Sequence, residues 1–341
     1  MSPAGEPQAP GTRFYGEEEG SSGLRLPDFF IVGHAKCGTT ALHMMLGQHP
    51  QVFMCPVKEP RFFAPELRSP YRSGKSPKRA ETLAQYAALF AGAGPEQLLG
   101  EASPQYIRSL DAAARIAEVR PDARIIAVLR EPASFLRSFH LQSVHNGQEP
   151  EADFGRAIAL EQARREGREL PPRSGSPGVL LYSDHVRYVE QLRRLHAAFG
   201  RDQVLVLIYD DLRADNEQTV KVILDFLGAD AAERLPAIET EPLRSVRFPA
   251  LHRLAADIRV AHYNPATAGR SARALDRLIP NFLRRPSVRT RWRGLVYGSG
   301  QPPRDEQLML ELRRRFKPEV VALSEYLDRD LVALWGYEAL D

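Results

Sequence analysis

Residues 28–40 read DFFIVGHAKCGTT and join two different hydrophobic patterns. Residues 29–32 form a short, continuous apolar run, which is typical of a parallel strand buried on both faces. From Thr39 to Gln48 apolar residues recur at helical spacing, so a helix is expected there, ending before His49-Pro50. A glycine-bounded loop therefore links a buried strand to a helix. Backbone N–H groups and the helix N-terminus converge in such a loop, which predicts a phosphate-binding site.

The loop differs from the nucleoside-triphosphate motif G-x-x-x-x-G-K-[ST] in the position of its lysine. Gly33 and Gly38 have the spacing of the two glycines, but Thr39 stands where the lysine belongs and Lys36 comes three places earlier. A kinase or NTPase needs that lysine on the β- and γ-phosphates, so its displacement favours a different phosphate ligand. An ordinary strand–turn–helix connection with incidental glycines is the alternative.

Strand and helix patterns alternate along most of the chain. Further strands are expected at 52–54, 97–101, 124–129 and 204–209, and further helices at 81–91, 132–146, 181–199, 218–227, 305–316 and 318–333. This alternation indicates an α/β fold, a parallel β-sheet flanked by helices on both faces. We expect one domain over residues 24–341, preceded by a disordered tail at 1–23 and interrupted by a variable helical and loop region at 240–303.

Composition limits the class of protein. Of 341 residues 43% are hydrophobic and 26% charged, as in a soluble globular protein. A net charge of +3 gives no broad basic surface, so no nucleic-acid partner is expected. With two cysteines, Cys37 and Cys55, a disulfide framework is excluded and a cytoplasmic location is favoured. The N-terminus has no apolar h-region and no apolar run approaches the ~18 residues of a membrane span, so a secreted, anchored or transmembrane protein is not expected. No cluster of residues has the spacing of metal ligands.

Two motifs in order resemble those of the sulfotransferases that use 3′-phosphoadenosine-5′-phosphosulfate (PAPS). Residues 29–42 resemble the 5′-phosphosulfate loop, and Arg130-Glu131-Pro132 followed by Ser138 resembles the 3′-phosphate motif. PAPS carries anions at both ends of its ribose, and an arginine fork suits a phosphate dianion. The alternative for Arg130 is a surface ion pair with Glu131. The resemblance implies cofactor contacts from the following residues: Lys36, Cys37, Gly38, Thr39, Thr40, Ala41, Arg130 and Ser138.

Three further stretches resemble the glycosaminoglycan-type and related bacterial sulfotransferases. Residues 57–63, VKEPRFF, are similar to the K-E-P-x-[FY]-F motif, and residues 100–106, GEASPQY, to the next strand-end motif. Residues 182–228 follow the family's long helix, strand and D/E-D-L turn. The resemblance covers roughly residues 28–228 and the last thirty residues, and it implies a P-loop-like sulfotransferase fold.

The resemblance also implies two catalytic roles. Glu59 is expected to take the proton of the acceptor as general base, and Lys36 to stabilise the leaving 5′-phosphate. The alternative for Glu59 is a loop glutamate that forms ion pairs with Lys58 or Arg61. The chain departs from the glycosaminoglycan branch at Ala102, where that branch often has lysine.

We therefore expect a PAPS-dependent enzyme without a metal, acting on a hydroxyl or amine of a carbohydrate or small natural product. A P-loop kinase or NTPase is one alternative, with Asp210 and Asp211 as its metal-binding carboxylates. A non-catalytic nucleotide- or glycan-binding protein is the other, although intact Lys36 and Glu59 argue against it. Basic stretches at 68–79 and 284–293 could bind an acidic acceptor or could simply be solvated. The acceptor's identity and the oligomeric state stay open.

Overall fold

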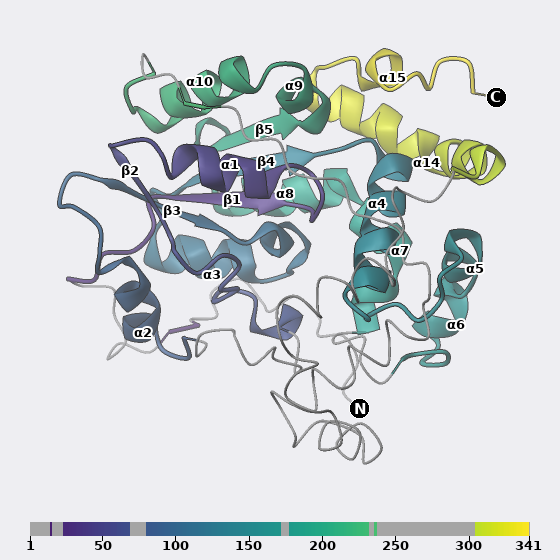
Figure 1. The fold of residues 1–341 in the computed structure, drawn as a ribbon, viewed down its shortest axis with the longest axis horizontal. Helices are drawn as coiled ribbons and strands as arrows, with labels where there is room; N and C mark the ends of the chain where they lie inside the picture. Colours follow the sequence, from purple (N-terminus) through teal and green to yellow (C-terminus); the bar gives the residue numbers. More distant parts are fainter. Residues whose placement is uncertain are drawn as a thin grey trace, which may run out of the picture.

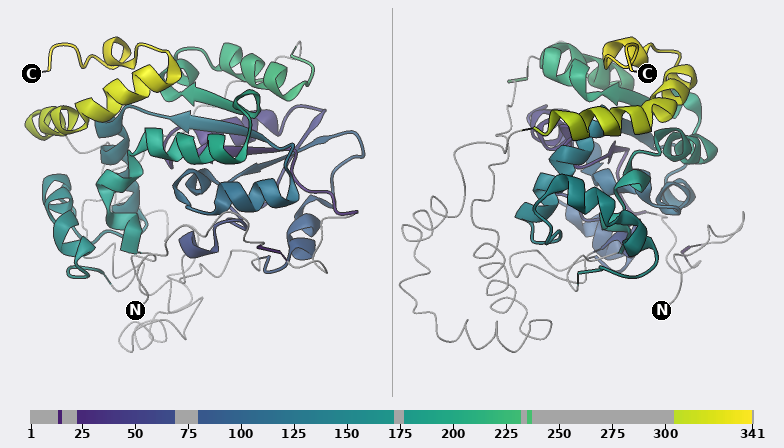
Figure 2. Two further views of the ribbon diagram at one scale, coloured as in Figure 1. Left: turned by 180° about the vertical axis from the view of Figure 1, so that it is seen from behind. Right: turned by 90° about the vertical axis from the view of Figure 1, so that its right-hand side faces the viewer.

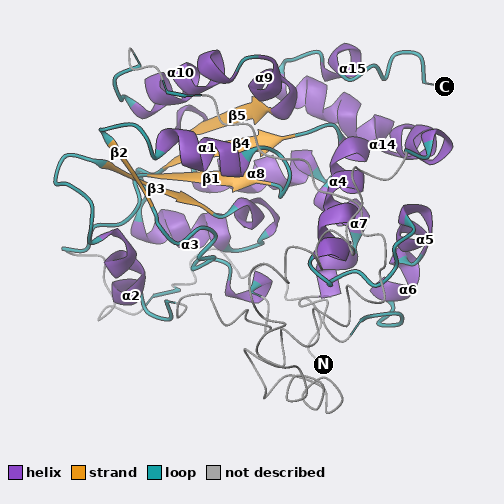
Figure 3. Ribbon diagram, in the orientation of Figure 1, coloured by secondary structure: helices purple, strands orange, loops and turns teal. Residues whose placement is uncertain are grey.

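Five parallel strands form one sheet in the part of the chain that the structure describes (Figures 1 and 3). The computed structural model describes residues 14–15, 23–68, 80–171, 177–231, 235–236 and 304–340. Several expectations concern residues outside these ranges. They are most of the N-terminal tail, most of the basic stretch at 68–79, and the whole variable region at 240–303 with its arginines at 284–293.

The strand order is β2-β3-β1-β4-β5, and every neighbouring pair is parallel. The strands are β1 (Phe29–Gly33), β2 (Val52–Met54), β3 (Leu98–Ala102), β4 (Arg124–Leu129) and β5 (Val204–Ile208). The apolar run that begins at Phe29 is buried along its whole length, because β1 lies in the middle of the sheet. The expected α/β class with a parallel sheet is therefore confirmed.

Helices cover both faces of the sheet. On one face α1 (Thr39–Leu46) contacts α10 (Asn216–Leu227), and on the other α3 (Ala112–Val119) contacts α8 (Tyr188–Ala198) (Figures 1 and 2). The remaining helices that the structure describes are α2 (Leu83–Ala87), α4 (Pro132–His145), α5 (Phe154–Ala159), α6 (Glu161–Arg165), α7 (Tyr182–His185), α9 (Tyr209–Ala214), α14 (Glu306–Leu327) and α15 (Leu331–Leu334). None of the described helices is long and apolar enough to cross a membrane.

Two helix predictions were wrong. The helix expected over 181–199 is divided into α7 and α8, which are separated by Val186 and Arg187. Conversely, the two helices expected at 305–316 and 318–333 are largely one, because α14 continues through Pro318. Proline inside a helix removes one backbone hydrogen bond. Helix α14 packs against α4, α8 and α15, and this packing stabilises it on both sides of the proline. Its apolar residues buried before and after Pro318 include Leu312, Phe316, Val320 and Leu323.

The end of β1 lies unusually close to β4. Gly33 has a φ of 134°, and a Cβ at this position would lie 2.4 Å from the carbonyl oxygen of Val128. Only glycine permits this approach, since a side chain would collide with the backbone of the neighbouring strand. The loop that follows Gly33 is thereby placed beside the loop that follows β4.

Candidate active site

A cavity of about 890 Å³ opens at the carboxyl ends of the strands. It is lined by the loop after β1, the segment around Glu59 after β2, the short helix η4 (Pro104–Arg108) after β3, and parts of α4 and α9. From β1 the chain continues to β2 and β3 on one side of the sheet, whereas from β4 it continues to β5 on the other. Ligands of open α/β sheets bind at such a crevice, where the strand order reverses.

The loop after β1 has the backbone geometry expected of an anion-binding turn. Lys36 and Gly38 have positive φ angles of 72° and 84°, and turns of this kind direct successive backbone N–H groups to one point. Gly38 is the N-cap of α1, and a Cβ there would lie 2.5 Å from Cδ2 of Leu212. The residues of the loop up to Ala41 line the cavity, except Cys37, whose side chain is buried in the core.

Two cations meet beside this loop. Arg130 lies directly after β4, and its Nη1 donates to the carbonyl oxygen of Lys36 at 2.9 Å. Both side chains line the cavity, and neither takes part in an ion pair with a described residue. Burial, and then the charge of Arg130, lower the pKa of Lys36. The local charge is therefore positive and not balanced by the protein residues described.

Arg130 is oriented by aromatic side chains. Its Cζ lies 4.7 Å from the ring centroid of Tyr209, a cation–π contact, and Tyr188 donates its hydroxyl to the carbonyl oxygen of Arg130 at 2.8 Å. The expected alternative, an ion pair with Glu131, does not occur: that carboxylate caps α4 by accepting from the N–H groups of Ala133 and Ser134. Arg130 is thus left facing the cavity.

Side chains of α4 extend this part of the wall. Ser138, which the sequence assigned to the 3′-phosphate, lines the same cavity as Arg130. Ser134, one helical turn earlier, lines it too and was not predicted. No motif includes Ser134. Its spacing is the signal that could have identified it, since residues four apart on a helix are neighbours and Ser134 lies on the same face of α4 as Ser138.

Glu59 lies in the cavity wall and forms ion pairs at the same time. Its Oε1 accepts from Nζ of Lys58 at 3.0 Å, and its Oε2 accepts from Nη2 of Arg61 at 2.7 Å and from Nε2 of Gln105 at 3.1 Å. The side chain is 27% exposed. The ion pairs that formed the alternative interpretation are present, but they lie at the cavity rather than on an open surface. The role of Glu59 as base stays a prediction.

These ion pairs set the protonation state of Glu59. Burial by itself would raise the pKa of Glu59, but the charges and hydrogen bonds of Lys58 and Arg61 outweigh it and lower the pKa to about 2. The carboxylate is therefore ionised at neutral pH, with both oxygens occupied. In this arrangement it is a weak proton acceptor, because a good general base has a pKa near the working pH.

The segment of Glu59 is bound to the end of β3. The N–H of Glu59 donates to the carbonyl oxygen of Ala102 at 3.1 Å, and the N–H of Arg61 donates to Oγ of Ser103 at 3.1 Å. Glu59 and Arg61 have positive φ angles of 57° and 54°. Two residues without glycine's freedom adopt left-handed conformations here, so the hydrogen bonds to β3 compensate for local strain.

A second carboxyl group lies behind this segment. Glu101 is fully buried, and its Oε2 accepts from the hydroxyls of Tyr86 and Tyr106, each at 2.8 Å. Burial raises the pKa of Glu101 to about 7, although the tyrosine hydroxyls oppose the shift. Glu101 does not line the cavity; it accepts from the hydroxyl of Tyr106, which in turn accepts from the N–H of Phe63 in the segment that follows Glu59.

The histidines near the motifs are neutral and bonded internally. His34 is buried, its Nε2 contacts Oε1 of Gln191 at 2.9 Å, and burial lowers its pKa to about 3. His140 contacts the hydroxyl of Tyr182 at 3.0 Å, and burial lowers its pKa also. The sequence interpretation assigned no catalytic role to either residue.

Asp210 and Asp211 do not lie at the cavity. Asp211 accepts two hydrogen bonds from Arg329, at 2.6 and 2.7 Å, and Asp210 accepts from Nε1 of Trp335 at 3.0 Å. Both carboxylates link α9 to the segments on either side of α15. Within the described ranges, no group of three or more potential ligands could hold a metal ion. The kinase interpretation thus loses its two candidate metal ligands.

Comparison with known proteins agrees with the motifs. Residues 27–233 match a protein-family model described as "Sulfotransferase family". The chain is 30% identical over 210 residues to bifunctional heparan sulfate N-deacetylase/N-sulfotransferase 2 of Mus musculus, covering 60% of this chain and 22% of that protein. It is 29% identical over 219 residues to heparan sulfate glucosamine 3-O-sulfotransferase 3A1 of Mus musculus, covering 64% of this chain and 49% of that protein. The chain thus spans half or less of these relatives.

A solved structure extends the likeness over almost the whole chain. The crystal structure of a sulfotransferase from Alicyclobacillus acidocaldarius is similar with a TM-score of 0.61 and 25% identity, covering 91% of this chain and 99% of that one. The matched family region contains β1 to β5 and the segments that line the cavity between Gly33 and Asn216. The chain therefore belongs to the sulfotransferase family, and its fold is the α/β sulfotransferase fold.

Proposed function

We propose that this sulfotransferase uses PAPS as donor and needs no metal ion, with a hydroxyl or amine of a carbohydrate or small natural product as acceptor. The observation that carries the proposal is the 2.9 Å hydrogen bond between Arg130 and the backbone of Lys36, which brings together two cations from neighbouring strand ends. Their charges face one cavity without a carboxylate partner among the described residues. A donor with a phosphosulfate at one end and a 3′-phosphate at the other matches two adjoining cationic sites.

The residues around the loop have separate tasks in this proposal. Lys36 and the N-terminus of α1 stabilise the negative charge that grows on the 5′-phosphate as it leaves. Arg130 binds the 3′-phosphate with its planar fork, and Ser138 adds a hydroxyl from α4. The ring of Tyr209 lies against the guanidinium and limits its orientations, so less entropy is lost on binding.

Glu59 accepts the proton of the attacking group. In the step we propose, a bond forms between the acceptor atom and sulfur, the bond from sulfur to the 5′-phosphate oxygen breaks, and the acceptor proton passes to the Glu59 carboxylate. The low pKa of Glu59 makes it a poor base while both cations remain in place. We therefore propose that Lys58 leaves the carboxylate when the acceptor enters, which raises the pKa of Glu59 toward the working pH.

The choice of acceptor rests on chemistry and on the relatives. Their names describe N-sulfotransfer and 3-O-sulfotransfer to heparan sulfate, which supports both an amine and a hydroxyl as acceptors for this chain. Because this chain spans only 22% and 49% of those proteins, their substrate is not carried over. A cavity of about 890 Å³ has the size of sites that take a cofactor or a small ligand.

The test compares nucleotides by calorimetry and by thermal unfolding. Adenosine 3′,5′-bisphosphate, the product of PAPS after transfer, should bind without Mg²⁺ and raise the melting temperature, because a ligand of the native state stabilises it by mass action. ATP with Mg²⁺ should stabilise less. A preference for ATP with Mg²⁺ would contradict the proposal and favour a kinase or NTPase. Incubation with PAPS and a metabolite pool, followed by mass spectrometry, then identifies the acceptor.

A further inference from the structure

Arg108 is a cation of the cavity wall that the mechanism above does not use. It is the last residue of η4, the same short helix that carries Gln105, a hydrogen-bond partner of Glu59. It lines the cavity together with Glu59 and Arg61. Arg108 therefore lies on the side of the cavity where the acceptor would approach the proposed base.

The partner of Arg108 is a neutral imidazole. Nη1 of Arg108 lies 3.2 Å from Nδ1 of His185, and Nε2 of His185 lies 3.0 Å from the carbonyl oxygen of Val179. A carbonyl only accepts, so Nε2 carries the proton and Nδ1 is left to accept from the guanidinium. Burial, and then the charge of Arg108, lower the pKa of His185 well below its usual range.

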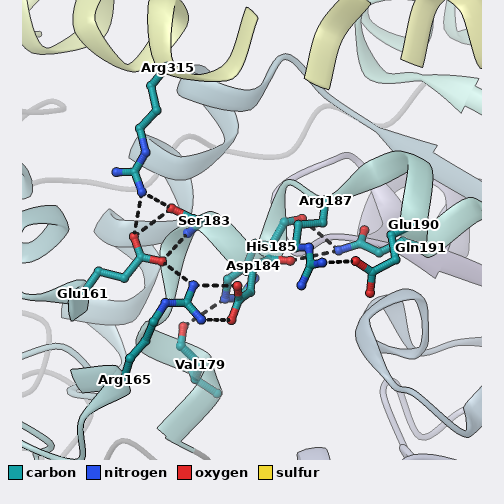
Figure 4. A network of polar contacts seen from close by, with 10 residues as sticks. All are labelled: Glu161, Arg165, Val179, Ser183, Asp184, His185, Arg187, Glu190, Gln191 and Arg315. Atoms are coloured by element: carbon teal, nitrogen blue, oxygen red, sulfur yellow. Dashed lines mark hydrogen bonds and ion pairs between the residues drawn. The ribbon is translucent and has the colours of Figure 1, made fainter. Parts of the chain in front are cut away.

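His185 is fixed by the helix on which it lies. Figure 4 shows α7 bound to α6: Glu161 accepts from the N–H of Ser183 at 3.0 Å and from its hydroxyl at 2.8 Å. Arg165 lies between Glu161 and Asp184 and donates to both carboxylates. These contacts hold the residues just before His185 and so fix the direction from which the imidazole reaches Arg108.

Gln191 connects this arrangement to the phosphate loop. Its Nε2 donates to the carbonyl oxygens of Asp184 and His185, at 3.1 and 3.2 Å, and its Oε1 contacts Nε2 of His34 in the loop after β1. The imidazole of His185 is therefore positioned relative to the loop that forms the proposed donor site. Through its contact with His185, the guanidinium of Arg108 is fixed in the wall of the cavity that contains this loop.

Two other arginines, one buried in the core and one in the cavity wall, have carboxylate partners, whereas Arg130 and Arg108 have none among the described residues. Arg164 is buried and donates to both oxygens of Glu149, at 2.8 Å each, and Arg61 is paired with Glu59. Arg108 is paired with no carboxylate among the described residues, and burial lowers its pKa to about 10, which still leaves it charged at neutral pH. A partly buried charge without a counter-ion is unfavourable, and an anion from a ligand would remove that penalty.

We propose that Arg108 binds an anionic group of the acceptor, a carboxylate or a sulfate, while the hydroxyl or amine of the same molecule lies at Glu59. Helix η4 would contribute to the recognition of both groups. Arg108 at its end binds the anion, and Gln105, one turn earlier, donates to the Glu59 carboxylate that receives the hydroxyl or amine. This inference rests on the proposed function, because it assumes that the acceptor enters this cavity. On this inference an acidic acceptor binds more tightly than its neutral analogue.

The test measures acceptor binding to enzyme saturated with adenosine 3′,5′-bisphosphate, so that no turnover is needed. The probes are p-nitrophenyl β-D-glucuronide, its uncharged C6 carboxamide, and p-nitrophenyl β-D-glucoside 6-sulfate. Wild type should bind an anionic probe about 10- to 100-fold more tightly than the carboxamide, the scale of a charge-assisted hydrogen bond. Comparison of the carboxylate and sulfate probes shows which anion is preferred.

Variants separate Arg108 from its surroundings. In Arg108→Met the preference for the anion should disappear, whereas binding of the bisphosphate should stay within about threefold of wild type, a difference below 1 kcal/mol. Arg187→Met is the matched control, since Arg187 follows His185 by two residues but is 60% exposed and paired with Glu190. Arg108→Lys keeps the charge and should retain part of the preference; it serves as the second variant if the methionine variant does not fold.

The outcomes distinguish a failure of the Arg108 inference from a failure of the proposed function. Equal binding of anionic and neutral probes by wild type, failure to bind any of them, or a preference that survives in Arg108→Met would overturn the inference and leave the donor assignment intact. Failure of wild type to bind adenosine 3′,5′-bisphosphate would instead contradict the proposed function.

Discussion

The guanidinium of Arg130 donates a 2.9 Å hydrogen bond to the carbonyl oxygen of Lys36. The two residues are 94 positions apart in the sequence, at the ends of β1 and β4, which are neighbours in the sheet. The bond connects the two segments proposed to bind opposite ends of the donor. The contribution of each segment to donor binding can therefore be measured by substitution of Arg130 and of Lys36.

Replacement of Arg130 by alanine should weaken the binding of adenosine 3′,5′-bisphosphate by about 1.5–3 kcal/mol, because a charge-assisted hydrogen bond to the 3′-phosphate is lost. Calorimetry provides the measurement. Arg193→Ala is the matched control, since Arg193 is an exposed arginine of α8 that does not line the cavity. Unchanged affinity in Arg130→Ala would mean that the 3′-phosphate binds elsewhere.

Replacement of Lys36 by alanine should reduce both turnover and affinity for the bisphosphate. The lysine is proposed to act on the bound phosphate and on the charge that develops as it leaves, so it contributes to the ground state and to the transition state. Initial rates with PAPS and calorimetry distinguish the two effects. A variant with normal turnover would exclude Lys36 from the leaving-group site.

Gly38→Ala should destabilise the protein more than Gly167→Ala. Both glycines have positive φ angles, 84° and 78°, so each substitution carries the strain of a left-handed alanine, about 1–2 kcal/mol. Only at Gly38 would the new Cβ also collide, 2.5 Å from Cδ2 of Leu212, whereas nothing lies within 4 Å at Gly167. Urea unfolding gives the difference, and equal losses of stability would argue against the tight contact.

The pH dependence of stability should report Glu101. Its pKa in the folded state is about 7, against an ordinary value of 4.5, so between these values the native state keeps a proton that the unfolded state has lost. The free energy of unfolding therefore falls as pH rises from about 4.5 to 7, by at most roughly 3 kcal/mol. Glu101→Gln removes the titrating group, and its stability relative to wild type should rise over that interval in urea unfolding. Parallel curves for the two proteins would contradict the raised pKa.

The sequence predicts the sheet well and the longer helices less well. Strands such as β1 and β4 are buried on both faces, so their apolar runs are visible without knowledge of their neighbours. The continuation of α14 through Pro318 was missed, because it depends on packing against α4 and α8 rather than on local preference. The break between α7 and α8 was missed for the same reason, since Ser183 and Asp184 bind α6.

The site could be predicted where a motif is continuous in sequence. Lys36, Arg130 and Glu59 lie in such motifs, and the structure brings all three to one cavity. Arg108 lies just outside the motif at 100–106 and His185 is 77 positions further along the chain, so their contact follows only from the folded chain. The ion pairs of Glu59 were foreseen as an alternative from its neighbours, but their effect on its pKa depends on burial, which sequence does not give.

The proposed mechanism requires Glu59 to take the proton of the acceptor, and the turnover of Glu59→Gln with PAPS and an identified acceptor tests this requirement. Glutamine keeps the shape but cannot take the proton, so turnover should fall by roughly 10²- to 10⁴-fold. Calorimetry should show nearly unchanged binding of adenosine 3′,5′-bisphosphate, because the phosphate loop and Arg130 are intact. Turnover above about one tenth of wild type would contradict the role of Glu59 as the base, since general base catalysis contributes more than that.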